Sequence, residues 1–262
     1  MLWWKALILG VVEGVTEFLP ISSTGHLILV STVVDYPEAQ RATFDISIQL
    51  GAVLALVWLY RDHLWSLVQR APSDPVARSL MGKLALAFLP AALAGYLFHH
   101  WIENHLFNTR VVAWALVGGG VALLWVDQRK HEERTREIEA VSWQQAIWVG
   151  TAQTLSLVPG VSRAAATILG GLMCGLSRPV ATQFSFYLSI PTLAAASLYS
   201  LYKVWDQLLV EDLGALAVGF VAAFASAFVV VEAFLRFVQR HTFLLFALYR
   251  IALGLLLIFW LV

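Results

Sequence analysis

The sequence predicts an all-α, polytopic integral membrane protein in which two re-entrant or broken helix hairpins and six transmembrane crossings form an inverted repeat. The first observation behind this prediction is composition, because 60% of the 262 residues are hydrophobic and only 13% are charged. A soluble domain is about half apolar and about one quarter charged. The second is a series of apolar stretches of bilayer-spanning length, and the third is a pair of apolar segments that proline and polar residues interrupt.

The crossings are predicted from apolar stretches close to the roughly 20 residues that a transmembrane helix needs. They lie at 46–60, 84–102, 111–126, 182–202, 213–235 and 243–262. Two further apolar segments, 3–34 and 143–177, each contain a polar cluster with a proline. Irregular backbone at membrane depth persists only where protein or a water-filled cavity surrounds it. We therefore predict that both segments are broken or re-entrant helix pairs.

The two halves of the chain look duplicated. At an offset of 140 positions, the matching pairs are Gly10 with Gly150, Glu13 with Gln153, Thr16 with Ser156, Ser22 with Ser162, Phe44 with Phe184 and Trp65 with Trp205. Each half contains one broken segment and three predicted crossings, and an odd number of crossings makes the halves face opposite ways. We predict a single membrane domain over 1–262, with a first repeat at 1–127 and a second, inverted repeat at 141–262.

The distribution of basic residues predicts the orientation, because cytoplasmic loops of membrane proteins are enriched in Lys and Arg. If the first broken segment returns to its starting side, loops 61–83 and 128–142 share the opposite side. The basic residues on that side are Arg61, Arg70, Arg78, Lys83, Arg129, Lys130, Arg134, Arg136, Arg178, Arg236 and Arg240. The other side has Lys5, Arg41, Arg110 and Lys203. We predict that the richer side is cytoplasmic and that both termini lie outside.

Glu13 and Glu17 stand four positions apart in the first broken segment, so their carboxylates share one helix face. Carboxylates are expensive inside hydrocarbon and indicate a functional site by default. Two of them repel each other unless a cation lies between them, and oxygen ligands of this kind suit Mg²⁺ or Ca²⁺. The alternative is a structural pair that forms hydrogen bonds across the helix bundle.

A hydroxyl cluster and a histidine follow the first proline. Ser22, Ser23 and Thr24 come shortly after Pro20, and His26 stands two positions after Thr24. A helix that begins here offers free backbone N–H groups to an anion. Because Ser23 and His26 are i,i+3 neighbours, the imidazole can reach the hydroxyl, which permits a base-activated Ser nucleophile or attack on phosphorus by His26 itself. The alternative is helix capping by the serines, with His26 as a buried hydrogen-bonding residue.

The second broken segment has an arginine at the corresponding place. Gly160, Ser162 and Arg163 follow Pro159, and Thr167 lies one turn further on. The planar guanidinium suits phosphate oxygens, so we expect Arg163 to bind phosphate. The alternative is an ion pair with one of the two carboxylates of the first segment.

Three other features have weaker interpretations. Gln153 can position water, a ligand or the metal, or it can form a hydrogen bond between membrane helices. We expect Arg250, near the start of the last crossing, to snorkel or to pair with Glu232. The glycines 118–120 lie inside a predicted span and permit close helix packing.

These motifs resemble those of the bacterial undecaprenyl-diphosphate phosphatase family, the bacitracin-resistance proteins. The resemblance is carried by Glu-Gly-Val-Thr-Glu-Phe-Leu-Pro-Ile-Ser-Ser-Thr-Gly-His-Leu at 13–27 and by Pro-Gly-Val-Ser-Arg at 159–163. It continues through 44–51 and 184–191, hence over nearly the whole chain. The sequence departs from the family pattern at Ala164, where a Ser is usual, and at Gln183, where a Glu is common.

The resemblance implies a multi-pass phosphatase of the bacterial inner (plasma) membrane, with its active site facing the periplasmic or outer side. Such an enzyme hydrolyses undecaprenyl diphosphate to undecaprenyl phosphate and inorganic phosphate. It thereby recycles the lipid carrier of peptidoglycan synthesis and confers bacitracin resistance. The implied partners are a polyprenyl diphosphate substrate and membrane lipids.

The resemblance also assigns roles within the candidate site. It implies that Glu13 and Glu17 bind the divalent cation, that Ser23 and His26 are catalytic, and that Ser162, Arg163 and Thr167 hold the diphosphate. Combined with the analysis of the residues, the predicted catalytic set is Ser23, His26, Glu17 and Arg163, and the predicted substrate-binding set is Ser22, Thr24, Gly160, Ser162, Arg163, Thr167 and Gln153.

A different class of protein has the same general pattern. Inverted repeats with broken helices and polar residues at the midplane also describe a secondary transporter or a flippase of polyprenyl phosphate. The pairing of Ser23 with His26 favours the enzyme, because a transporter needs no nucleophile. A homodimer is compatible with the sequence, whereas the formal net charge of zero gives no support for a nucleic-acid partner.

Overall fold

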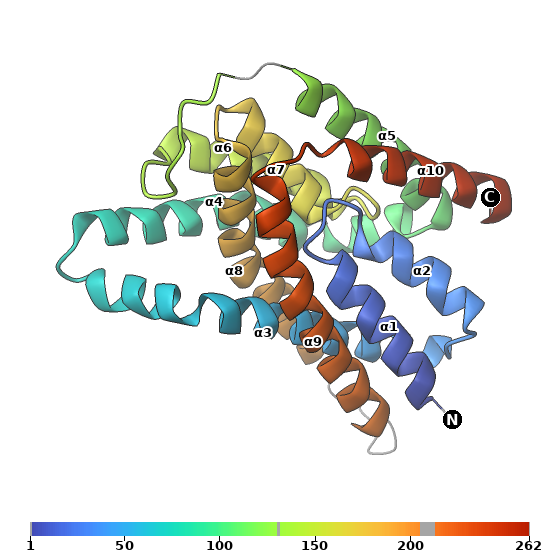
Figure 1. Ribbon diagram of the computed structural model, residues 1–262. Coiled ribbons are helices and arrows are strands. Elements are labelled where there is room, and N and C mark those ends of the chain that lie inside the picture. The colour runs from blue at the N-terminus through green and yellow to red at the C-terminus, as the bar shows by residue number, and fades with distance from the viewer. Residues whose placement is uncertain (1, 130–131, 205–212, 262) are drawn as a thin grey trace.

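The computed structural model describes residues 2–129, 132–204 and 213–261, and these are helical over most of their length (Figure 1). The helices are α1 (Trp3–Thr16), α2 (Ser23–Val33), α3 (Glu38–Arg70), α4 (Pro75–Leu106), α5 (Thr109–Gln128), α6 (Trp143–Gln153), the 3₁₀ helix η1 (Thr154–Leu157), α7 (Arg163–Met173), α8 (Arg178–Val204), α9 (Leu213–Val238) and α10 (Leu244–Leu261). No β-strand occurs in these ranges, apart from one isolated bridge between Thr135 and Leu176. The prediction of an all-α polytopic membrane protein is confirmed. Lys130 and Trp205, which entered the charge count and the repeat, lie outside the described residues.

Within the described residues, five helices are long and apolar enough to cross a membrane: α3, α4, α5, α8 and α9. The sixth predicted crossing, 243–262, corresponds to α10, whose apolar stretch is shorter. The number of six crossings therefore stays a prediction.

The prediction of a long loop at 61–83 is wrong, because α3 continues to Arg70 and α4 already begins at Pro75. A short turn is enough here because Asp74 caps α4 and accepts a hydrogen bond from the Val76 N–H at 2.8 Å. This hydrogen bond, together with one from the Arg70 guanidinium, holds the pKa of Asp74 below its usual value.

The two interrupted segments form the predicted broken helix pairs. In the first, α1 ends at Thr16, a turn follows, and α2 begins at Ser23; in the second, α6 and η1 are followed by a turn before α7 begins at Arg163. We call the turns at 17–22 and 158–162 the first and second hairpin loops. The residue before each second helix is a serine with a left-handed backbone, and φ is 71° at both Ser22 and Ser162. The duplicated motif therefore has the same unusual backbone twice.

Matching glycines allow the hairpins to pack closely against long helices. A Cβ atom at Gly10 of α1 would contact the backbone of Gly219 on α9, and a Cβ atom at Gly150 of α6 would contact the backbone of Ala87 on α4. Small residues of this kind let membrane helices approach each other. The first helix of each half thus packs on the fourth helix of the other half. This reciprocal packing supports the inverted repeat. The boundaries of the two repeats, 1–127 and 141–262, stay predictions.

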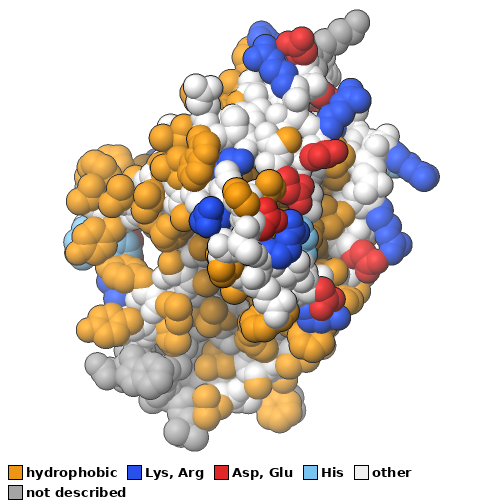
Figure 2. Space-filling view, turned by 90° about the vertical axis from the view of Figure 1, so that its left-hand side faces the viewer, with side chains coloured by type: hydrophobic (Ala, Val, Ile, Leu, Met, Phe, Trp, Pro, Cys, Tyr) orange, Lys and Arg blue, Asp and Glu red, His pale blue; other side chains and the backbone are white. Residues whose placement is uncertain are grey.

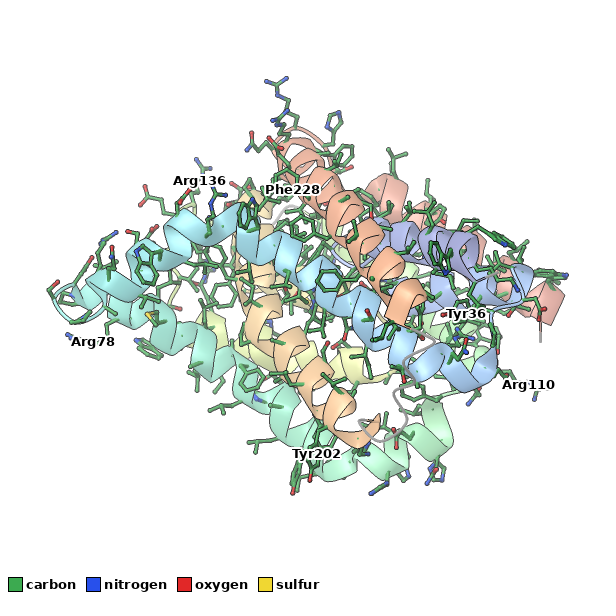
Figure 3. The ribbon with its side chains drawn as sticks, turned by 90° about the horizontal axis from the view of Figure 1, so that it is seen from below. Tyr36, Arg78, Arg110, Arg136, Tyr202 and Phe228 are labelled. Atoms are coloured by element: carbon green, nitrogen blue, oxygen red, sulfur yellow. The ribbon has the colours of Figure 1, made fainter. Side chains whose placement is uncertain are left out.

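The surface has the character expected of a membrane protein. In Figure 2, hydrophobic side chains cover the lower and left parts of the visible face, and charged side chains gather toward the top and right. Figure 3 shows Arg78 and Arg136 toward one end of the molecule and Arg110 toward the other. This separation agrees with the two groups of basic residues, although the side of the membrane on which each group lies stays a prediction.

Candidate functional site

The two hairpins meet at an ion pair between Glu17 and Arg163. Glu17 directly follows the last residue of α1, and Arg163 begins α7. Arg163 Nη2 donates to Glu17 Oε1 at 3.2 Å. The two side chains are only 6% and 7% exposed, in that order. The structure therefore brings the carboxylate of one half into contact with the arginine of the other. The contact is the ion pair that was the alternative to phosphate binding by Arg163.

The same carboxylate also binds the hydroxyl of Ser23. Ser23 Oγ donates to Glu17 Oε2 at 2.6 Å, a length typical of hydrogen bonds to an ionised acceptor. The turn around Pro20 folds the start of α2 back against the end of α1. As a result, one carboxylate joins a hydroxyl from the first hairpin to a guanidinium from the second.

Ser23 and His26 do not form with each other the hydrogen bond that their spacing permits, since each side chain has another partner among the described residues. Nδ1 of His26 lies 2.8 Å from the carbonyl oxygen of Ser22, and its Nε2 lies 2.7 Å from the hydroxyl of Tyr249. The carbonyl can only accept, so Nδ1 carries a hydrogen and Nε2 of the neutral ring accepts from Tyr249. The i,i+3 spacing places Ser23 and His26 near each other, but each side chain has a better partner on another part of the chain.

Arg163 is oriented by a second helix. Its Nη1 donates to the carbonyl oxygen and the hydroxyl of Ser185 on α8, at 3.2 and 3.4 Å. Thr167 supports this arrangement, since its hydroxyl is 2.6 Å from that of Ser185 and donates to the carbonyl oxygen of Arg163 at 2.9 Å. Thr167 is completely buried, so it positions Arg163 through Ser185.

One nitrogen of Arg163 remains available. Nε is buried and has no hydrogen-bond partner among the described residues.

Ser185, which the sequence analysis did not include, stands between two core phenylalanines, and the ring of Phe186 packs edge-to-face on Phe18 at 5.7 Å. The only sequence signal for Ser185 is a hydroxyl in an apolar helix.

Glu13 is the second predicted cation ligand. It is 2% exposed, and its Oε2 has no hydrogen-bond partner within the described part of the chain. The carboxylates of Glu17 and Asp45 are both close enough to repel it. A buried carboxylate oxygen without a donor, beside other carboxylates, fits a hard divalent cation. Within the described ranges no group of three or more His, Cys, Asp or Glu side chains has the geometry of a metal site, so water or substrate would have to complete the ligand set.

Gln153 occupies the position in the second half that Glu13 occupies in the first. It is fully buried, and its Oε1 accepts from the Thr192 hydroxyl on α8 at 3.3 Å. Its Nε2 has no partner among the described residues. The described contact of Gln153 is thus one between helices.

The remaining predicted substrate-binding residues lie at the helix starts. The Ser162 hydroxyl caps α7 by accepting from the Ala165 N–H at 3.2 Å, whereas the buried Ser22 makes no such capping bond to α2. Thr24 is half-buried in the first turn of α2. Both helix starts offer backbone N–H groups to an anion. Because Ser162 caps its helix and Ser22 does not, the Ser22 hydroxyl is the more available of the two for a substrate.

The expectation for Arg250 is wrong. Its side chain is completely buried, and Glu232 instead pairs with Arg236 on its own helix. Arg250 donates to the carbonyl oxygens of Pro20, Ala115, Gly160 and Val161. It faces inward because α10 packs along α5 (Figure 1). The signal was present in the sequence, since a charge within an apolar helix indicates a functional position by default.

An apolar groove of about 530 Å³ lies between α1, α2 and α10. Its polar lining consists of His26, Tyr249 and Thr16, and the rest of its lining is Val11, Val12, Val15, Ile21, Val30, Leu245 and Phe246. The groove has room for a hydrocarbon chain whose polar end lies near His26.

The chain is similar to known proteins over most of its length. Residues 6–256 match the family described as bacitracin resistance protein BacA. A protein of Aromatoleum aromaticum named undecaprenyl-diphosphatase is 50% identical over 250 residues, which cover 95% of this chain and 91% of that protein. Undecaprenyl-diphosphatase 2 of Shewanella oneidensis is 48% identical and covers 96% of both chains. An undecaprenyl-diphosphatase of Pseudomonas aeruginosa is 48% identical over 98% of this chain and 94% of its own.

Proposed function

This chain belongs to the bacitracin resistance protein BacA family, and from that membership we propose that it is a membrane phosphatase. It hydrolyses undecaprenyl diphosphate to undecaprenyl phosphate and inorganic phosphate, and this activity confers resistance to bacitracin. The observation that carries the proposal is the carboxylate of Glu17, which binds the Ser23 hydroxyl and the Arg163 guanidinium at once. A candidate nucleophile, a proton acceptor and a guanidinium that can bind phosphate thus lie in one cluster.

The reaction begins with attack of Ser23 on the terminal phosphorus. Ser23 Oγ forms a bond to this phosphorus while its hydrogen passes to Glu17 Oε2, its hydrogen-bond acceptor at 2.6 Å. The bond between the phosphorus and the bridging oxygen breaks, and undecaprenyl phosphate leaves with the electron pair. Arg163 stabilises the charge on the transferred phosphoryl group, for which its Nε is available because it has no hydrogen-bond partner among the described residues.

Water then releases the phosphate from Ser23. The oxygen of water bonds to phosphorus while the bond between phosphorus and Ser23 Oγ breaks. One proton of the water passes to Nε2 of His26 and the proton on Glu17 passes to Ser23 Oγ, and His26 gives its proton to solvent as inorganic phosphate leaves. His26 suits this role because its Nδ1 is held by the Ser22 carbonyl, which leaves Nε2 as the basic nitrogen. In this scheme Ser23 is the nucleophile, and His26 acts in the second step.

Glu13 and Glu17 would hold the divalent cation, Mg²⁺ or Ca²⁺. When bound, the cation would neutralise charge on the diphosphate. Without it, the unpaired oxygen of Glu13 has no compensating partner in the described structure.

The apolar groove beside His26 accepts the first part of the prenyl chain, so that the head group reaches the cluster from within the bilayer. We place the protein in the bacterial plasma membrane, with the site facing the outer side. There it recycles the lipid carrier of cell-wall synthesis. The bias of basic residues supports this orientation.

Purified protein in detergent, with no membrane gradient, tests the function. Wild-type protein is expected to release inorganic phosphate from undecaprenyl diphosphate, and a Ser23→Ala variant is expected to release almost none. A transporter or flippase would release no phosphate under these conditions. Equal release by the wild type and the variant would contradict the assignment of the site.

A further inference from the structure

Arg250 connects the two hairpin loops through one guanidinium group. Its Nη1 donates to the carbonyl oxygen of Pro20 in the first loop at 3.1 Å. Its Nη2 donates to those of Gly160 and Val161 in the second loop at 3.1 and 2.8 Å. A single side chain on α10 thus binds the backbone of two segments that come from opposite halves of the chain.

The bound carbonyls occupy the same place in the duplicated motif. Pro20 and Gly160 are separated by 140 positions, and each stands two residues before a serine with a φ of 71°. A left-handed backbone at a serine is unfavourable and persists only where the surrounding structure holds it. Arg250 supplies part of that support to Ser22 and Ser162 alike. The helix start at Ser23 and the helix start at Arg163 are therefore oriented by the same group.

Glycines of α5 make room for this guanidinium. A Cβ atom at Gly119 would contact Nη2 of Arg250 and would lie 2.8 Å from its Cζ. The neighbouring Ala115 carbonyl accepts a further hydrogen bond from Nη2 at 3.3 Å. Gly118, one position away, has open space around its Cα, and a Cβ atom there would contact nothing within 4 Å. The glycine run therefore has one position that Arg250 requires and one that it does not.

The charge of Arg250 has no acidic partner. No ion pair within the described ranges includes it, and its hydrogen bonds are to neutral carbonyls. A buried, unpaired cation is costly, so a role in the site explains its presence better than a role in stability. Its positive charge, held against both loops, also favours an anion close to them.

We propose that Arg250 is a positioning residue that fixes the two hairpin loops relative to each other, so that Ser23 and Arg163 face the same phosphate. It acts through the backbone and does not touch the substrate. The inference rests on the proposed phosphatase function and identifies what aligns its two half-sites.

The test compares Gly119→Ala with Gly118→Ala in the purified protein. The added methyl group at Gly119 displaces the end of a flexible side chain, so the fold is retained while the guanidinium loses its bonds. We expect kcat for undecaprenyl diphosphate to fall about 100-fold with Gly119→Ala, as for a small misplacement of reacting groups. KM is expected to stay within roughly threefold of wild type, because binding by Arg163 is retained. Gly118→Ala, the same change on the same helix, is expected to leave both constants unchanged.

Hydrogen exchange gives a second measurement that does not depend on activity. The N–H groups of Ile21 and Val161 are bonded within their loops, to the carbonyl oxygens of Leu19 and Val158. Both amides are expected to exchange faster in the Gly119→Ala variant than in wild type, and at the wild-type rate in the Gly118→Ala variant. Normal turnover and normal exchange with Gly119→Ala would overturn the proposal, as would equal effects of the two substitutions.

Arg250→Lys serves if Gly119→Ala does not fold. Lysine keeps the charge but has no planar fork that can reach both loops, so the same fall in kcat and the same faster exchange are expected. Wild-type turnover with Arg250→Lys would overturn the role of the guanidinium. If the wild-type protein releases no phosphate from undecaprenyl diphosphate, the proposed function fails, and the exchange measurement alone decides whether Arg250 holds the loops.

Discussion

Ser23 and Glu17 join the two helices of the first hairpin, with Ser23 Oγ donating to Glu17 Oε2 at 2.6 Å. Glu17 also binds Arg163 of the other hairpin. One carboxylate therefore lies between the candidate nucleophile, Ser23, and the guanidinium that we expect to bind phosphate. The chemistry of the site depends on that arrangement.

The pairing of Ser23 with Glu17 can be tested by a double-mutant cycle. Ser23→Ala and Glu17→Gln are each expected to lower turnover by about 10³-fold or more, and the double variant is expected to be little worse than either, because a nucleophile and its base act as a unit. Thr32→Ala removes an exposed hydroxyl from the same helix and is expected to have no effect. Multiplicative losses in the double variant would contradict the pairing, and mapping a trapped phosphoryl group to His26 would identify a different nucleophile.

Removal of the cation tests the role of Glu13. Chelation is expected to abolish phosphate release, and added Mg²⁺ or Ca²⁺ is expected to restore it. Glu13→Gln should weaken the response to the cation, because the amide has one acceptor oxygen and no charge. Glu38→Gln, at an exposed position of α3, is the matched control. Full activity of the wild type in chelator would show that the carboxylates have another purpose.

Arg163→Lys should fold but lose about 100-fold or more in turnover, because the point charge of lysine cannot bind Glu17, Ser185 and phosphate together. Turnover and thermal stability in detergent are the quantities to measure. Arg236→Lys changes an arginine whose ion pair with Glu232 is exposed, and it is expected to behave as wild type. If Arg163→Lys retains normal kcat, the guanidinium fork is not required.

Tyr249 is expected to support His26 without being essential. Tyr249→Phe removes the hydroxyl that lies 2.7 Å from His26 Nε2, and the loss of one hydrogen bond of about 1 kcal/mol corresponds to roughly a fivefold lower kcat. In a His26→Ala background the same change should have no further effect. Tyr202→Phe, at an 83% exposed position, controls for the substitution. An equal loss of kcat from Tyr249→Phe in the wild type and in the His26→Ala variant would show that Tyr249 does not act through His26.

The orientation can be measured by labelling single cysteines in a Cys174→Ser background. Cysteines at Arg78 and Arg136 are expected to react only from the cytoplasm, and a cysteine at Arg110, at the other end of the molecule in Figure 3, only from outside. Labelling of positions 78 and 136 from opposite sides would contradict the inverted repeat.

A cysteine pair at Ser22 and Ser162 is expected to crosslink, because both hairpin loops bind Arg250.

The class of the protein could be predicted from the sequence, and so could the two polar clusters that form the candidate site, although not Ser185 or the contacts of Arg250. Apolar stretches identify membrane helices because the bilayer core imposes a length and an absence of charge. The two polar clusters stand out because ionised groups are costly in hydrocarbon. The helix breaks before Ser23 and Arg163 follow from local backbone preferences around Pro20 and Pro159, which depend on neighbouring residues only.

The partners of the site residues required the tertiary structure. Spacing along one helix suggested His26 as the partner of Ser23, but the turn between α1 and α2 directs that hydroxyl to Glu17. Arg250 binds carbonyls that lie 230 and 90 positions away in the chain, whereas its place near the start of the last predicted crossing suggested snorkelling. The sequence by itself determined which segments are apolar and where the helices are interrupted, because hydropathy and helix periodicity are local properties. Which groups satisfy one another was decided only when α10 packed on α5 and brought both hairpin loops within reach of one guanidinium.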